Sequence, residues 1–156
     1  EYYEILALLA AGNTKAAARK AGMRRLWDKG SFAHINLPLF TSGDTLIIFD
    51  YFKRSILYYN LSGRQTGSCP VRFEWRQSQQ FEILKDEATG RFFIHRYDSK
   101  SRQTIEELDI HTGTTSGAAE IGKPFAENVK VHNGNIYFLW QAPGGSTQQI
   151  YTQPVN

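Results

Sequence analysis

Hydrophobic and polar positions follow two different periods along the chain. From Tyr2 to about Lys29, alanines and other apolar residues recur with helical spacing, interrupted at Gly12 and Gly22. Alanine has the highest helix propensity of any residue, so this segment is expected to form two short helices. After Gly30 the alanine-rich character ends, and short runs of β-branched and aromatic residues between turn residues predict strands.

Three of the strand-like runs share one form, in which a small polar turn precedes about four apolar or aromatic residues and a polar or aromatic tail. The three runs are "SGDTLIIFDYF" (42–52), "ATGRFFIHRYD" (88–98) and "HNGNIYFLWQA" (132–142). When Asp44, Gly90 and Gly134 are placed in register, the steps between the runs are 46 and 44 residues. A period of this length is typical of repeated supersecondary units.

Each run has neighbours that predict a small sheet. A strand-like run precedes it closely enough to form a hairpin, and another follows it. The preceding runs are "INLPLF", "FEILKD" and "NVKVHN", and the following runs are "SILYYNLSG", "QTIEELDIHTG" and "STQQIYTQPV". Turns at Gly63 and Gly113 then lead to weaker fourth strands, predicted at "CPVRFEW" (69–75) and "AAEIGKPF" (118–125). A unit of four strands that repeats about every 45 residues is typical of the blades of a propeller.

The motifs "GDTLIIFDYFKRSILYYNLSG", "GRFFIHRYD", "LDIHTG" and "NGNIYFLWQ...QQIYTQPV" make the segment from about Leu37 to Val155 similar to a known family. It resembles the TolB-like six-bladed β-propeller proteins that are common in gut bacteria. The resemblance implies an exported protein of the periplasm or cell surface. Six blades need about twice this length. We therefore expect the C-terminal half of a larger propeller, two copies that join as a homodimer, or a half-open array with capped edges.

The predicted fold is mainly β, a partial β-propeller with an N-terminal helical segment. A basic helical segment at residues 1–30 precedes about 2.5 to 3 four-stranded blades, at about 31–80, 81–127 and 128–156. The aromatic fraction of 13% agrees with strands, on which rings pack well. The lone Cys69 excludes an internal disulfide framework. No apolar run approaches the roughly 20 residues that span a bilayer, so no membrane span is predicted.

The net charge of +3 comes from the first thirty residues, which hold six basic and three acidic side chains. Within them, "GNTKAAARKAGMRRLWDK" (12–29) resembles the helix-turn-helix of Fis-like DNA-binding proteins. Under this alternative, the nucleic-acid contacts would come from Lys15, Arg19, Lys20, Arg24 and Arg25. The apolar anchor expected six residues after Gly22 falls on Asp28, which would place the second helix out of phase. We therefore expect the basic helices to cover a flank of the propeller rather than to bind DNA.

Candidate catalytic and cofactor motifs are incomplete. "GAAEIGKP" (117–124) follows the phosphate-loop spacing until Pro124, which replaces the Ser or Thr that would hold magnesium, so a strand connection is predicted there. The histidines, at positions 34, 95, 111 and 132, lack the spacing of a zinc site. The adjacent pairs Asp86-Glu87 and Glu106-Glu107 would point to opposite faces of a strand, and the first is followed by turn residues. No catalytic residue, metal ligand or cofactor is predicted.

The ends of the second strands supply the candidate ligand site. Loops of a propeller gather at one end of its channel, where polar and aromatic groups form ligand surfaces. The predicted ligand-binding residues, at equivalent positions of the three repeats, are Asp50, Tyr51, Arg96, Tyr97, Trp140 and Gln141. A simpler interpretation is that Phe52, Tyr97 and Trp140 pack between blades. The sequence therefore favours a non-catalytic binding or scaffolding domain for an unknown protein or small ligand, with a channel-mouth enzyme as the alternative.

Overall fold

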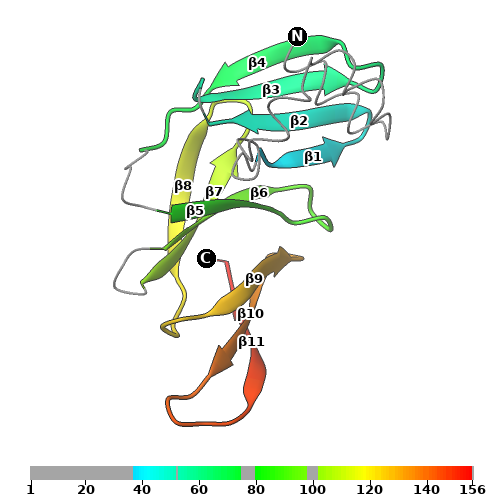
Figure 1. The fold of residues 1–156 in the computed structure, drawn as a ribbon. Helices are drawn as coiled ribbons and strands as arrows, with labels where there is room; N and C mark the ends of the chain where they lie inside the picture. The colour runs from blue at the N-terminus through cyan, green and yellow to red at the C-terminus, as the bar shows by residue number, and fades with distance from the viewer. Residues whose placement is uncertain (1–36, 52, 75–79, 98–101, 156) are drawn as a thin grey trace, which may run out of the picture. The chain divides into compact units, whose positions relative to one another are not determined.

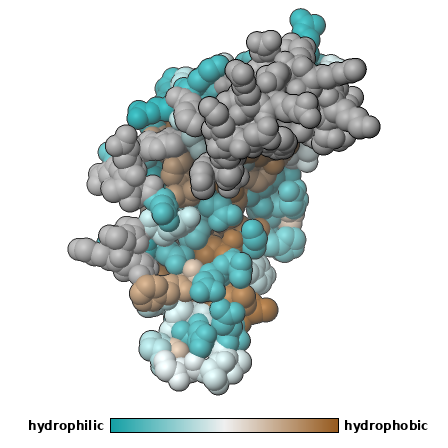
Figure 2. All heavy atoms as spheres, viewed as in Figure 1, coloured by the Kyte–Doolittle hydropathy of each residue, from teal (hydrophilic) through white to brown (hydrophobic). Residues whose placement is uncertain are grey.

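The computed structural model describes residues 37–51, 53–74, 80–97 and 102–155. These described residues form eleven strands and no helix, so the prediction of a mainly β fold is confirmed. The predicted helices of residues 1–30, with the basic candidates for DNA contact, lie outside the described residues. On the face seen in Figure 2, hydrophilic residues predominate among the described side chains, with smaller apolar areas between them.

The chain divides into two compact units, of which the first holds residues 1–53 and 57–68. Most of a four-stranded sheet belongs to it, a meander in the order β1-β2-β3-β4 in which the first two residues of β3 and the last two of β4 are counted with the second unit (Figure 1). The strands are β1 (Leu39–Ser42), β2 (Thr45–Asp50), β3 (Ser55–Asn60) and β4 (Gln65–Pro70). Ser42 pairs with Thr45 across a two-residue turn in which Gly43 has a φ of 54°. A small hydrophobic cluster in this unit is formed by Ile48, Leu57 and Tyr59.

The second unit, residues 54–56 and 69–156, contains two antiparallel sheets. The four-stranded sheet runs in the order β5-β6-β7-β8, with β5 (Gln80–Lys85), β6 (Phe92–Tyr97), β7 (Gln103–Asp109) and β8 (Thr114–Glu120). The three-stranded sheet runs in the order β11-β10-β9, with β9 (Glu127–His132), β10 (Asn135–Gln141) and β11 (Gln148–Pro154). The three predicted hairpins and their following strands are therefore present as β1–β3, β5–β7 and β9–β11.

The two sheets of the second unit share one hydrophobic core. It joins Leu84, Phe93, Ile105 and Ala119 of the first sheet with Val129, Val131, Ile136 and Phe138 of the second. Strand alternation explains the choice, because Ile136 and Phe138 face this core whereas Tyr137, between them, is 37% exposed. Burial of each large side chain contributes about 1.5–3 kcal/mol, so this layer dominates the stability of the unit.

The fourth strands begin four residues earlier than the sequence predicted, at Gln65 rather than 69 and at Thr114 rather than 118. Both start directly after their turn and are largely exposed. Because these strands are rich in Gly, Ser, Thr and other small residues, their sequences show no alternation of apolar and polar residues that would predict a strand. The prediction was drawn instead to Phe73 and Ile121, which are buried but lie in the connections after β4 and β8.

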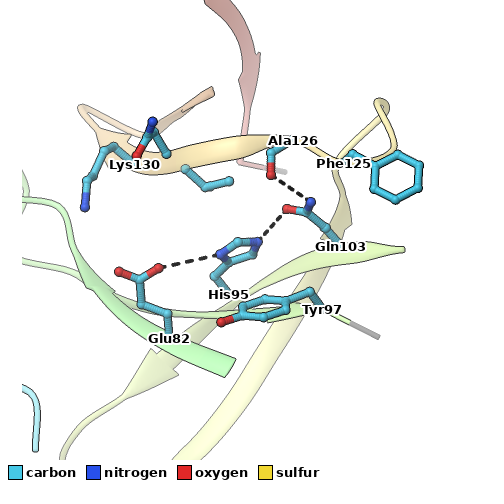
Figure 3. A pocket seen from close by; sticks show the side chains of 9 residues that line it. Glu82, His95, Tyr97, Gln103, Phe125, Ala126 and Lys130 are labelled. Carbon is cyan, nitrogen blue, oxygen red and sulfur yellow. Dashed lines mark hydrogen bonds and ion pairs between the residues drawn. The ribbon is translucent and has the colours of Figure 1, made fainter. Parts of the chain in front are cut away.

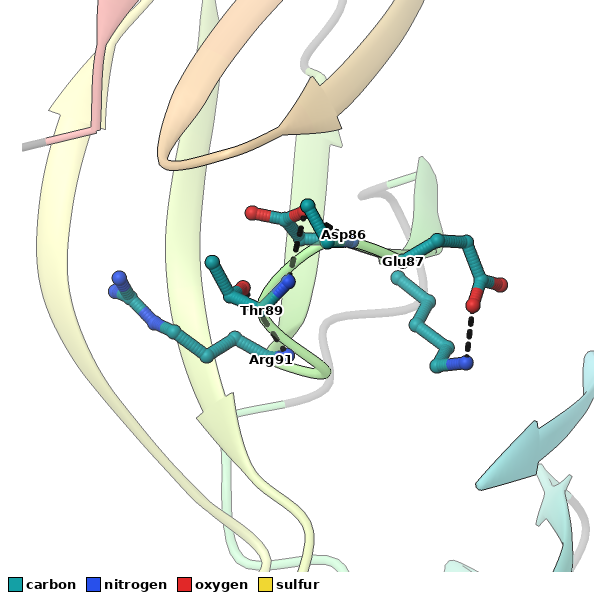
Figure 4. A network of polar contacts seen from close by, with 6 residues as sticks. Asp86, Glu87, Thr89 and Arg91 are labelled. Atoms are coloured by element: carbon teal, nitrogen blue, oxygen red, sulfur yellow. Dashed lines mark hydrogen bonds and ion pairs between the residues drawn. The ribbon is translucent and has the colours of Figure 1, made fainter. Parts of the chain in front are cut away.

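Hydrogen bonds from a buried carboxylate tie the turns of the two sheets together. Figure 4 shows Asp86 in the β5–β6 turn, where its side chain is 0% exposed. Its oxygens accept the backbone N–H groups of Asn133 at 3.0 Å and Gly134 at 2.9 Å, in the β9–β10 turn, and that of Ala88 at 3.0 Å. Burial alone would raise the pKa of Asp86, but these donors, with that of Thr89, hold it well below its usual range. The predicted turn role of Asp86 is confirmed, and the cross-sheet bonds extend it.

Candidate functional site

The second unit has two distinct ends. We call the end that carries the β5–β6, β7–β8 and β9–β10 turns the turn end, and the opposite end, where β6 and β10 finish, the loop end. At the loop end, Tyr97 pairs with both Gln80 and Gln103, so β5, β6 and β7 meet there. The connection 121–126 between β8 and β9 reaches the same end. Segments distant in sequence therefore converge at the loop end.

A cavity of about 360 Å³ opens at this end, and we call it the His95 cavity (Figure 3). Polar and aromatic side chains dominate its lining, which includes Glu82, His95, Tyr97, Gln103, Phe125 and Lys130. Strand geometry explains three of them. Glu82 is the register partner of His95, and Tyr97 lies two residues beyond His95 on the same face of β6.

A chain of hydrogen bonds fixes the proton on His95. The side-chain Nε2 of Gln103 donates to the carbonyl of Ala126 at 2.8 Å, because a carbonyl can only accept. The remaining amide atom, Oε1 of Gln103, must then accept a hydrogen bond from the ring of His95, whose Nε2 lies 2.8 Å away. The proton of a neutral His95 therefore sits on Nε2, and its Nδ1 carries a free lone pair.

Burial keeps this imidazole neutral. His95 is 5% exposed, and burial lowers its pKa below the ordinary value, outweighing the opposing effects of Gln103 and Glu82. Among the described residues, no group donates a hydrogen bond to Nδ1 of His95. The carboxylate Oε2 of Glu82 lies 3.9 Å from it, as the dashed line in Figure 3 marks. Two hydrogen-bond acceptors thus face each other across a gap at the cavity wall.

Two aromatic side chains border the His95 cavity. The ring of Tyr97 lies 5.2 Å from that of His95, between centroids. Phe125, on the connection between β8 and β9, is 73% exposed and has a φ of 58°. That left-handed conformation costs a side chain with a Cβ roughly 1–2 kcal/mol. Phe125 therefore combines a strained backbone with an exposed ring at the edge of the cavity.

A second cavity of about 220 Å³, the Trp140 cavity, also lies at the loop end and shares Phe125. Trp140 donates its indole N–H to the carbonyl of Pro124 at 2.9 Å, and its ring packs against the shared core. The ammonium of Lys123 lies 4.5 Å from the centre of the same ring. Trp140 is therefore held in place by the protein itself, as the packing interpretation expects.

The structure distributes the six predicted ligand-binding residues over different environments. Tyr97 lines the His95 cavity, and Trp140 and Gln141 line the Trp140 cavity. Arg96 lies on the opposite face of β6, where it is 7% exposed and bonds the carboxylate of Glu106 at 3.0 Å. Arg96 thus bridges β6 and β7 and lines neither the His95 cavity nor the Trp140 cavity.

The other two predicted residues, Asp50 and Tyr51, belong to the first unit. Asp50 ends β2, is 2% exposed and accepts the backbone N–H of Lys53 at 3.0 Å. Tyr51 follows it and is half-buried. Both lie where the sequence placed them, directly at the end of the second strand of their repeat.

Apart from Tyr97, sequence reasoning missed the residues of the His95 cavity, which are Glu82, His95, Gln103, Phe125, Ala126, Asn128, Val129 and Lys130. His95 and Glu82 could have been found, because strand alternation puts His95 on the face of Tyr97 and hairpin register puts Glu82 opposite His95. Gln103 and Phe125 carry no such signal. Their positions depend on segments that meet only in the folded unit.

The described part of the chain bears on three other kinds of site, namely metal sites, phosphate loops and membrane spans. There, no three His, Cys, Asp or Glu side chains gather closely enough to hold a metal ion. Segment 117–124 forms the end of β8 and the connection to β9, so the predicted strand connection is confirmed. The described residues also include no helix long and apolar enough to cross a membrane. No protein-family model matches the chain, and no curated protein matches it either.

Proposed function

We propose that the chain is a non-catalytic binding domain that takes its ligand at the loop end of the second unit. The observation that carries this proposal is the convergence of β5, β6, β7, β9 and the 121–126 connection around the His95 cavity. Sites for small ligands are concave and combine apolar surface with a few polar groups from different segments. The cavity has this composition, with Tyr97 and Phe125 beside Glu82, His95 and Lys130.

The proposal includes a propeller-like array of TolB-like type, with the exported location that the resemblance implies. Its support is the repeat of hairpin and third strand at steps of 46 and 44 residues, seen as three separate sheets. In the second unit, adjacent sheets also bury a shared core, as stacked blades must. A four-stranded blade exposes two faces, so each blade needs a neighbour.

The exposed face of the three-stranded sheet is evidence for a further blade. His95 pairs with Ile105 in the first sheet of the unit, and the equivalent pair in the second sheet is Leu139 with Ile150. Ile105 is 0% exposed because the neighbouring sheet covers it, whereas Ile150 is 75% exposed. We therefore propose that another blade covers this face. We take this blade to come from a second copy of the chain, which can be tested with the chain alone.

Light scattering over a concentration series tests the second copy. A dimer is expected, and Ile150→Lys should convert it to a monomer because a charge would be buried in the interface. Leu61→Lys is the matched control, since Leu61 is 64% exposed and lies in the first unit. A monomer at every concentration, or a dimer that both substitutions leave intact, would overturn pairing through this face.

Fragment binding followed by amide chemical shifts tests the ligand site. With the full ¹⁵N-labelled chain, fragment hits are expected to shift Tyr97, Gln103 and Asn128, which all line the His95 cavity at the loop end. Gly90 and Asn135, at the turn end, should not move. Hits that gather at the turn end would overturn the proposed site. Turnover of a panel of model esters and glycosides, abolished by Glu82→Gln, would overturn the non-catalytic part of the proposal.

A further inference from the structure

We propose that the His95 cavity binds a neutral sugar, with two neighbouring hydroxyl groups donating to His95 Nδ1 and to the carboxylate of Glu82. This inference rests on the proposed binding function and names its ligand class. Its starting point is the pair of acceptors, 3.9 Å apart, at the wall of the cavity, where the hydrogen-bond chain through Gln103 and Ala126 leaves the buried Nδ1 of His95 without a donor in the described part of the chain.

The acceptor pair selects for a ligand that donates hydrogen bonds. A buried acceptor without a donor costs free energy, and Nδ1 of His95 is such an atom among the described residues. An anionic group would meet the lone pair of His95 and the charge of Glu82, so anions are disfavoured. A vicinal diol offers two O–H donors side by side, one for each acceptor.

The charges of the cavity favour a ligand without net charge. Glu82 is half-exposed and contributes a negative charge, and Lys130 on β9 contributes a positive one. These charges offset each other across the same open space. The ammonium of Lys130 also supplies donors for the ether and hydroxyl oxygens that a sugar carries besides its O–H groups. A metal ion would find only one imidazole and one carboxylate here, fewer than the ligand sets of protein metal sites.

The aromatic border supplies the apolar contact that a sugar ring needs. One face of a pyranose carries C–H groups, which pack against aromatic rings. Phe125 keeps its ring 73% exposed at the cavity edge in spite of its left-handed backbone. Strained backbone held at a cavity is a common feature of functional sites. A role in packing against the ligand accounts for both properties of Phe125.

Titration of the full ¹⁵N-labelled chain tests the ligand class. The added compounds are maltotetraose, cellotetraose and mannotetraose, with spermidine as a cationic and citrate as an anionic comparison. At least one sugar is expected to shift Tyr97, Gln103 and Asn128 saturably. The ¹⁵N signal of His95 Nδ1 should begin in the position of an unprotonated nitrogen and move on binding.

Two variants locate the contacts. Glu82→Gln should weaken sugar binding about tenfold, because the hydroxyl then bonds a neutral amide oxygen in place of a charged carboxylate. The control, Glu87→Gln, changes an exposed carboxylate of the turn end and should leave binding unchanged. Phe125→Asn removes the ring, keeps a residue that accepts the left-handed backbone, and should weaken binding severalfold.

The outcomes separate this inference from the proposed function. Fragments that bind at the loop end while every sugar fails would overturn the sugar and leave the binding site standing. Spermidine or citrate at the same residues, without a sugar, would overturn it in the same way. A proton found on His95 Nδ1 at neutral pH would overturn the sugar proposal, because Nδ1 would then be a donor and not an acceptor. Sugar shifts confined to the turn end would overturn both proposals.

Discussion

The buried polar groups at the two ends of the second unit differ in their hydrogen bonding. At the turn end, the carboxylate of Asp86 is 0% exposed and accepts N–H groups from two turns. At the loop end, His95 is 5% exposed, but its Nδ1 faces another acceptor, Glu82. Both side chains belong to the β5–β6 hairpin. One hairpin therefore carries a buried carboxylate with several donors at one end and, at the other, a buried imidazole nitrogen without a donor among the described residues.

The largest expected effect comes from removing the carboxylate at the turn end. Asp86→Ala leaves the N–H groups of Asn133 and Gly134 without their acceptor and should lower the free energy of unfolding by about 4 kcal/mol. Asp109→Ala is the matched control, because Asp109 is exposed and bonds only within its own turn. It should cost less than about 1 kcal/mol. Urea unfolding, followed by the amide signals of β6, measures both, and equal losses would refute the cross-sheet role.

A smaller loss is expected from crowding the turn end. Gly113, in the β7–β8 turn, has a φ of 71°, and a Cβ there would lie 2.0 Å from the carbonyl oxygen of Pro70. Gly113→Ala should therefore cost about 3 kcal/mol, from backbone strain and overpacking together. Gly90 has a φ of 73° but open space around its Cβ position, so Gly90→Ala should cost only about 1 kcal/mol. The same unfolding assay applies, and an equal cost at both positions would show that packing at Gly113 is loose.

The sequence predicts more of the turn end than of the loop end. The hairpins of the turn end follow from local signals, because turn glycines such as Gly90 and Gly134 precede short runs of apolar and aromatic residues. The fourth strands lack those signals and were misplaced. At the loop end, Tyr97 could be placed from its repeat position. The contact between Gln103, at the start of β7, and Ala126, in the connection before β9, spans 23 residues, and no local pattern encodes it.

Acidification should affect the two ends in different pH ranges. The pKa of His95 is lowered on folding, so its contribution to stability is present above the ordinary value of 6.5 and is lost as the pH falls below it. The pKa of Asp86 is also lowered, but from 3.8, so its contribution is lost only at more acidic pH. Unfolding free energies measured from pH 7.5 down to pH 2 should therefore fall first below pH 6.5 and begin to fall again below pH 3.8.

Variants assign the two steps. His95→Gln should remove the step below pH 6.5, whereas His132→Gln, at an exposed position of the turn end, should leave it in place. Asp86→Ala should reduce the more acidic step, and Asp109, whose pKa is also lowered by hydrogen bonds within its turn, should account for part of what is left. If His132→Gln flattened the upper step instead, His95 would not be the buried neutral group that the loop end requires.

The smallest expected effect is a gain in stability at the loop end. Phe125 holds a left-handed backbone, with a φ of 58°, and exposes 73% of its surface, so folding gains little from its ring. Asparagine tolerates this conformation better, and Phe125→Asn should therefore raise the free energy of unfolding by about 0.5–1 kcal/mol. Leu61→Asn, at another exposed apolar position, should change it by less than about 0.5 kcal/mol. A loss on Phe125→Asn would mean that the ring stabilises the fold. A gain would mean that the loop end keeps a residue that weakens it, as a surface selected for a ligand does.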